Sequence, residues 1–285
     1  MASPNVPGME PFLGSAAIQR GEFTRRSLAR GHRAIYRDVY VRRDVELTAR
    51  IRAQAAWLST GATLAGMSAA AVHGTKWLNP AMPAEIIRAD RHASTGIVVR
   101  SWTLDPGETC RVAGTEATSA SRTAFDLGRL HRFDDAVPMV DALLNATRIK
   151  PADVLAVADA HPGARGVAQL RLLLPMIDAG AESPQESRLR LLIVRGGLPA
   201  PETQIEFREL RIRVDMGWRE WKVAVEYDGV QHWTDRRQRA WDIDRIALLE
   251  EADWVVVRVS AEMMSRPQVI VERVRAKLRA AGCPV

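Results

Sequence analysis

The sequence of 285 residues predicts a mixed α/β (α+β) protein. Residues 183–281 follow the order α-β-β-β-α-β-α, which is typical of a mixed sheet flanked by helices. The preceding residues are mostly amphipathic helices, with strand-like runs at 84–89 and 96–102. Hydrophobic and charged contents of 47% and 26% are ordinary for a globular protein. No apolar run approaches the length of a membrane span.

The front of the chain contains a compact basic unit. Thr24 is placed to cap a short helix that stops at Gly31, and residues 34–43 alternate as a strand, a tight turn and a second strand. The stretches GEFTRRSLARG and YRDVYV in this unit resemble the winged-helix segment at the front of AbiEi-type antitoxins. That resemblance implies DNA binding, with the neighbouring arginines Arg25 and Arg26 as candidate phosphate contacts.

A second interpretation of this unit stays open. About five residues separate Gly31 from the first wing strand, whereas a recognition helix needs about two to three turns to lie in a major groove. Without that helix, the unit would be a packing element with a solvated arginine face. The stretches SAAAVHG and TSASRTAFDL continue the AbiEi resemblance, and they indicate fold rather than activity.

The middle of the chain is predicted to be largely helical. Apolar residues at helical spacing predict helices at 45–58, 119–130 and 133–147, a small-residue helix at 64–75 and two further helices within 151–178. Residues 178–183 are the best linker candidate. We therefore predict three parts: a degenerate winged-helix-like unit at 1–60, an AbiEi-like mixed α/β middle region at 61–180 and a C-terminal domain at 181–285.

The C-terminal domain has the clearest element signals. Its first helix should begin with Ser183 as N-cap and Pro184 at the first helical position, and should end at Gly196 and Gly197. The remaining elements are expected as strands at 203–207, 211–218 and 221–229, a helix at 242–253, a strand at 254–260 and a closing amphipathic helix at 267–281.

Four stretches in this domain, SPQESRLR, RVDMGW, VEYDGVQH and DIDRIALLEEADWVVVRV, occur in order and at close spacing within 183–265. Together they resemble the PD-(D/E)XK nuclease superfamily, and within it the branch related to very-short-patch-repair (Vsr) endonucleases. The resemblance implies a restriction-endonuclease-like fold and metal-dependent hydrolysis of phosphodiester bonds. The expected cofactor is Mg²⁺, or Mn²⁺ in its place, because a hard cation can activate water and neutralise charge on the phosphate.

The candidate metal ligands are carboxylates near one end of the predicted hairpin. Asp215 and Glu226 can be brought together by strand pairing, and Glu226 shares a strand face with Asp228. Glu226 would be costly to bury without a partner. Asp215 and Asp228 also suit turns, and Asp228 precedes Gly229. Glu186 could join the site through a metal-bound water, or could simply complete a capping box.

The superfamily motif contains a lysine two residues after its second acid, and Asp228 occupies that position here. Lys222 lies four residues before Glu226, about 13 Å along a strand, so it should not reach the same water. The Vsr-related branch uses a downstream histidine, and His232 fits that pattern as a candidate base. Gln231 and Arg245 are candidate nucleic-acid contacts, and Arg245 could equally form a salt bridge with an acid.

Three functions are compatible with these features. The first is a Mg²⁺-dependent DNA endonuclease in a defence or toxin–antitoxin setting, and the second is an inactive DNA-binding regulator that retains the nuclease scaffold. The third is an RNA-directed nuclease. Two cysteines and the absence of a signal-peptide pattern predict a cytoplasmic protein without a membrane partner. A homodimer or a cognate toxin–antitoxin partner stays open.

Overall fold

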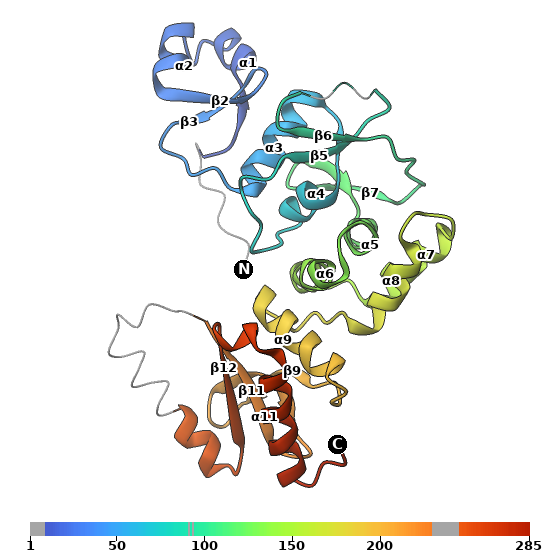
Figure 1. Cartoon of the computed structure of the whole chain (residues 1–285). Helices are drawn as coiled ribbons and strands as arrows, with labels where there is room; N and C mark the ends of the chain where they lie inside the picture. The colour runs from blue at the N-terminus through green and yellow to red at the C-terminus, as the bar shows by residue number, and fades with distance from the viewer. Residues whose placement is uncertain (1–8, 91, 93, 230–244) are drawn as a thin grey trace. The chain divides into compact units, whose positions relative to one another are not determined.

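The computed structural model describes residues 9–90, 92, 94–229 and 245–285. The chain divides into two compact units, Met1–Pro175 and Met176–Val285. Both units combine helices with sheets (Figure 1), which confirms the predicted mixed α/β class. Among the helices of the described residues, none is long and apolar enough to cross a membrane.

The first unit begins with the predicted helix and hairpin. A three-stranded sheet in the order β1-β3-β2 adjoins two short helices. The side chain of Thr24 accepts a hydrogen bond from the backbone N–H of Ser27 (3.1 Å), which confirms the predicted N-cap. The first wing strand starts at His32, directly after the helix, so the space for a recognition helix is smaller than the expected five residues. These elements are β1 Phe12–Leu13, α1 Gly14–Gln19, α2 Arg25–Gly31, β2 His32–Tyr36 and β3 Val39–Arg42.

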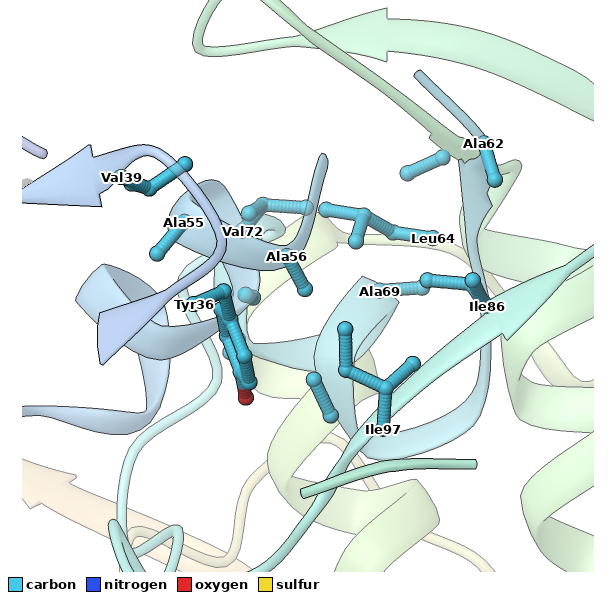
Figure 2. Packing of buried hydrophobic residues seen from close by; sticks show 14 residues of the cluster. Tyr36, Val39, Ala55, Ala56, Ala62, Leu64, Ala69, Val72, Ile86 and Ile97 are labelled. Atoms are coloured by element: carbon cyan, nitrogen blue, oxygen red, sulfur yellow. The ribbon is translucent and has the colours of Figure 1, made fainter. Parts of the chain in front are cut away.

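Strands β2 and β3 share a hydrophobic core with the elements that follow them. Figure 2 shows Tyr36 and Val39 in one cluster with Ala55 and Ala56 of α3 (Ala49–Thr60), together with residues of α4 (Gly66–Val72) and the larger sheet. The hydroxyl of Tyr36 also donates to the carbonyl of Gly96 (3.2 Å). The basic unit is therefore part of a larger core rather than an independent arm.

The larger sheet of the first unit has five strands in the order β6-β5-β4-β8-β7. Strands β5 and β6 and the four helices after the sheet confirm the sequence prediction, whereas the β7–β8 hairpin was not predicted. Its turn residues Ala113 and Gly114 both have positive φ (48° and 79°), as a type I′ turn requires, but Ala-Gly is not a usual signal for that turn. The elements are β4 Thr63–Leu64, β5 Ala84–Ile87, β6 Ile97–Arg100, β7 Thr109–Val112, β8 Thr115–Thr118, α5 Ala120–Leu130, α6 Phe133–Thr147, α7 Pro151–Ala160 and α8 Val167–Leu173.

The second unit follows the predicted order α-β-β-β-α-β-α. Its four-stranded sheet has the order β12-β11-β10-β9, with β11 and β12 parallel and the other neighbours antiparallel, so the predicted mixed sheet is confirmed. Residues 245–251 are helical between β11 and β12. The named elements are α9 Pro184–Arg195, β9 Glu202–Phe207, β10 Ile212–Trp218, β11 Val223–Asp228, β12 Val255–Ser260 and α11 Pro267–Ala280.

Both faces of this sheet are covered. Val223 and Val225 of β11 pack in a cluster with α9 and α11, while Ala224 packs in a second cluster with Leu249 of the 245–251 helix. The predicted alternation of β11 is therefore confirmed. Glu226 follows Ala224 on the second face, and this face carries the candidate site.

Candidate functional site

The regular alternation of β10 is interrupted at Asp215. Along an unbroken strand, alternate residues lie on one face of the sheet. Ile212 and Val214 pack in the cluster with Leu249, whereas Met216 packs in the cluster with α9 and α11. In the described residues the backbone ladder pairs the neighbours of Asp215 on both sides, but not Asp215 itself. Such interruptions often re-aim a side chain next to a functional site.

The carboxylate of Asp215 bridges to the next strand. Its Oδ2 accepts a hydrogen bond from the backbone N–H of Tyr227 (2.8 Å), so the acid from β10 lies beside the acids at the end of β11. Burial raises the pKa of Asp215 to about 7, and the nearby carboxylate of Glu186 acts in the same direction. The Tyr227 amide and Arg245 only partly oppose this rise, since Glu226 adds further negative charge.

Glu226 is buried and bound to an arginine. Its two carboxylate oxygens accept hydrogen bonds from Nη1 and Nη2 of Arg245, the second at 2.6 Å. Arg245 Nη1 also donates to the carbonyl of Arg213 in β10 (3.1 Å). Of the two interactions expected for Arg245, the structure therefore contains the salt bridge. This bidentate geometry is the strongest form of an arginine–carboxylate pair.

Asp228 ends β11 and forms a second ion pair. Its Oδ2 accepts a hydrogen bond from Nη2 of Arg258 on β12 (2.6 Å), and both side chains are about one-third exposed, at 32% and 36%. Lys222 lies at the opposite end of β11, where its Nζ donates to the carboxylate of Asp253 (3.2 Å). The prediction that Lys222 does not reach the site is confirmed. Arg258 lies within the quoted stretch DIDRIALLEEADWVVVRV, but it was not predicted as a site residue.

Glu186 lies in the first turn of α9, as expected. Its backbone N–H donates to Oγ of Ser183 (3.2 Å), which confirms the cap. The carboxylate does not return to Ser183, however, and instead accepts hydrogen bonds from the N–H of Glu182 (2.9 Å) and from Nε2 of Gln204 (3.0 Å). Gln204 has a positive φ of 52°, in the left-handed region. The reciprocal capping box is thus incomplete, and the acid is held towards the sheet.

Asp215, Glu226 and Asp228, together with Arg245 and Arg258, line a small polar cleft of about 130 Å³. Among the described residues, the carboxylates here do not form a group of three whose ligand atoms all lie within 4.8 Å of one another. Glu226 and Asp228 are instead each paired with an arginine, Arg245 and Arg258. The cleft is lined by Asp215, Glu226, Tyr227, Asp228, Gly229, Arg245 and Arg258.

Of the other predicted site residues, Arg25 and Arg26 lie within the described residues. Gln231 and His232 lie outside the described residues. Arg25 and Arg26 are both exposed on α2, where a solvated arginine face was one of the two expectations.

A second group of ligand-type side chains was not found from the sequence. Asp105, Glu108 and His161 have ligand atoms within 4.8 Å of one another. Glu108 already accepts hydrogen bonds from His161 Nε2 (2.6 Å) and from Arg122. Because His161 lies 53 residues after Glu108, no local spacing could have indicated this group.

The chain is similar to two curated mycobacterial proteins. Uncharacterized protein MT2308 of Mycobacterium tuberculosis strain CDC 1551 / Oshkosh and uncharacterized protein Rv2248 of strain ATCC 25618 / H37Rv are each 32% identical to it over 160 residues. The match covers 55% of this chain and 59% of each relative, so it spans less than two thirds of their length. No family model matches the chain, and neither does any solved structure.

Proposed function

We propose that this protein is a Mg²⁺-dependent endonuclease, able to use Mn²⁺, that hydrolyses phosphodiester bonds in DNA, in a defence or toxin–antitoxin setting. The observation that carries the proposal is the buried position of Asp215 close to the carboxylates of Glu186 and Glu226. Asp215 lies at an interruption in the strand ladder, where burial and Glu186 raise its pKa to about 7. A cleft arranged in this way is stabilised by a bound cation.

The donor set fits a hard divalent cation. Asp215 and Glu226 supply carboxylate oxygens, which Mg²⁺ prefers, and this ion commonly uses only one or two protein carboxylates beside its waters. When bound, Mg²⁺ would supply charge neutralisation and an activated water at the phosphate. Glu226 would exchange its bonds to Arg245 for the cation. Glu186, held near the sheet by Gln204, would hold a water of the cation.

The base that takes the proton from the attacking water is proposed from the sequence. His232 follows Asp228 by four residues and can accept a proton near neutral pH. Arg245 cannot take this role, because its guanidinium stays protonated.

A second candidate is an inactive DNA-binding regulator that keeps the nuclease scaffold. One specific observation favours it: both oxygens of Glu226 are bound by Arg245, so the internal ion pair takes the place of a metal. The absent motif lysine points the same way. The two candidates differ in whether a cation can displace Arg245.

The deciding experiment combines plasmid cleavage with calorimetric titration of Mn²⁺. We expect nicking that requires Mg²⁺ or Mn²⁺, and loss of both cleavage and cation binding in an Asp215→Asn, Glu226→Gln double variant. Asp105→Asn is the matched control, since it removes an acid from the group formed with Glu108 and His161. Wild-type affinity in the double variant would contradict the endonuclease. Loss of affinity in Asp105→Asn alone would move the metal site to the first unit.

A further inference from the structure

Among the described residues, the guanidinium groups of Arg245 and Arg258 line the cleft, and of these two only Arg245 has a role in the proposed function. Arg245 balances Glu226, while Arg258 reaches the cleft from β12. In the parallel pairing of β11 and β12, Arg258 lies directly beside Glu226. Its neighbours Val257 and Val259 pack against α9 and α11, so Arg258 points to the opposite face, which it shares with Glu226.

The ion pair between Arg258 and Asp228 does little for the fold by itself. Both side chains are about one-third exposed, at 36% and 32%, and exposed ion pairs of this kind contribute little to the free energy of unfolding. The effect of the pair is to fix the position of the Arg258 guanidinium. One hydrogen bond of 2.6 Å, from Nη2 to Asp228, fixes the guanidinium at the cleft. With respect to the described residues, the other N–H groups of Arg258 can donate to an anion.

We propose that Arg258 binds the phosphate group next to the scissile bond, and that Asp228 is the residue that positions it. This inference rests on the proposed function, because it names the phosphate-binding group of the same cleft. The motif lysine would have supplied a positive charge two residues after Glu226. Here Asp228 occupies that position and binds the guanidinium of Arg258, which lies on the neighbouring strand β12. Asp228 then acts through Arg258 and is not a metal ligand.

The test measures phosphate contact and cleavage separately on the full chain of 285 residues. Binding of a short fluorescent DNA duplex is followed by anisotropy in Ca²⁺ at several salt concentrations, and cleavage of the same duplex is followed in Mg²⁺. We expect Arg258→Ala to lower the salt slope by about one and cleavage on the order of 10²-fold, with Mn²⁺ affinity retained. Arg258→Lys should keep the salt slope and recover part of the rate, because it keeps the charge but not the planar fork.

The Asp228→Asn variant distinguishes a role of Asp228 in positioning Arg258 from a role in stabilising the fold. It should lower kcat while the salt slope and melting temperature stay at wild-type values, because the charge on Arg258 remains but loses its anchor. A purely structural Asp228 would change the melting temperature and leave kcat alone. Arg219→Ala is the matched control: Arg219 forms a similar single pair with Glu202 (3.0 Å), and it does not line the cleft.

The outcomes separate this inference from the proposed function. Cleavage and a salt slope in Arg258→Ala equal to those of wild type would overturn the role of Arg258 and leave the endonuclease standing. A lowered salt slope without cleavage by wild type in any cation would support the phosphate contact and contradict the endonuclease. Absence of duplex binding by wild type, or an equal loss in Arg219→Ala, would overturn the inference. If Arg258→Ala does not fold, Arg258→Gln replaces it with the same expectations.

Discussion

The two units each contain a cluster of acids and arginines, but the balance of charge differs. In the first unit, Asp126 is fully buried and accepts hydrogen bonds from Arg122 (2.9 Å) and from Arg129 (2.9 Å). Arg122 also binds Glu108, whose other oxygen accepts from His161. The second unit has the cleft acids Asp215, Glu226 and Asp228 with Glu186 nearby, and the arginines Arg245 and Arg258.

The two clusters differ in the charges that surround a buried acid, and this difference distinguishes a structural cluster from a candidate metal site. Burial raises the pKa of Asp126 even though two guanidinium groups oppose the rise. Burial also raises the pKa of Asp215, but there Glu186 and Glu226 act in the same direction, and the value reaches about 7. Of the described residues, only the Tyr227 amide hydrogen-bonds to Asp215. Each acid of the first cluster has a guanidinium partner, whereas the proposed function predicts that the second cluster gains stability from a cation.

The largest expected effect is on the stability of the first unit. Arg122→Ala would leave Asp126 and Glu108 with buried charge and one guanidinium fewer, and breaking such a network costs about 3–5 kcal/mol. Urea denaturation of the full chain measures this loss. Arg171→Ala is the control, because its pair with Asp159 is exposed and should contribute at most about 1 kcal/mol. A loss in Arg122→Ala as small as in the control would show that the cluster is not structural.

The second prediction concerns pH and Asp215. The pKa of its carboxyl is about 7 in the folded protein, whereas the usual value of 3.8 applies in the unfolded chain. Because the folded protein holds this proton more tightly, the free energy of unfolding falls as pH rises from 3.8 to about 7. Asp215→Asn should remove that loss and make the metal-free protein more stable than wild type above pH 7 by about 1–4 kcal/mol. Denaturation of both proteins from pH 4 to 8 in EDTA measures this difference in stability. If the free energies of unfolding of the two proteins changed with pH in parallel, the raised pKa of Asp215 would be contradicted.

Most of the fold of the second unit was predictable because its signals are local. Ser183 and Pro184 mark the start of α9, and alternating apolar residues mark the strands. The β7–β8 hairpin was missed because Ala113 adopts a positive φ, which is uncommon for a residue with a side chain.

The candidate site was predictable only in part. Strand pairing brought Asp215 and Glu226 to neighbouring strands, as their sequence positions predicted. The interruption at Asp215 and the contact of Arg258 with Asp228 depend on register between strands, which no single stretch of sequence encodes. A basic residue in the middle of the apolar run WVVVRVS was the signal that could have indicated Arg258.

The third prediction asks whether a cation can replace an arginine. Arg245→Ala leaves buried Glu226 without its guanidinium, and we expect a loss of about 1–3 kcal/mol in EDTA. Mn²⁺ should restore this stability and bind more tightly than to wild type, because its competitor is gone. Thermal melting with and without Mn²⁺ measures the rescue. The same addition should not rescue Arg122→Ala, and rescue of both variants would erase the distinction between the clusters.

The smallest effect is expected at the exposed arginines of the first unit. Deleting residues 1–44 would test their role poorly, because Tyr36 and Val39 belong to the core and their loss would expose it. The double variant Arg25→Gln, Arg26→Gln keeps the fold, and its stability should stay within about 0.5 kcal/mol of wild type. If both arginines contact phosphates, the slope of log affinity against log salt for duplex DNA should fall by about two, since each contact releases roughly one counterion. An unchanged slope would leave DNA binding to the cleft of the second unit and identify α2 as a packing element with a solvated face.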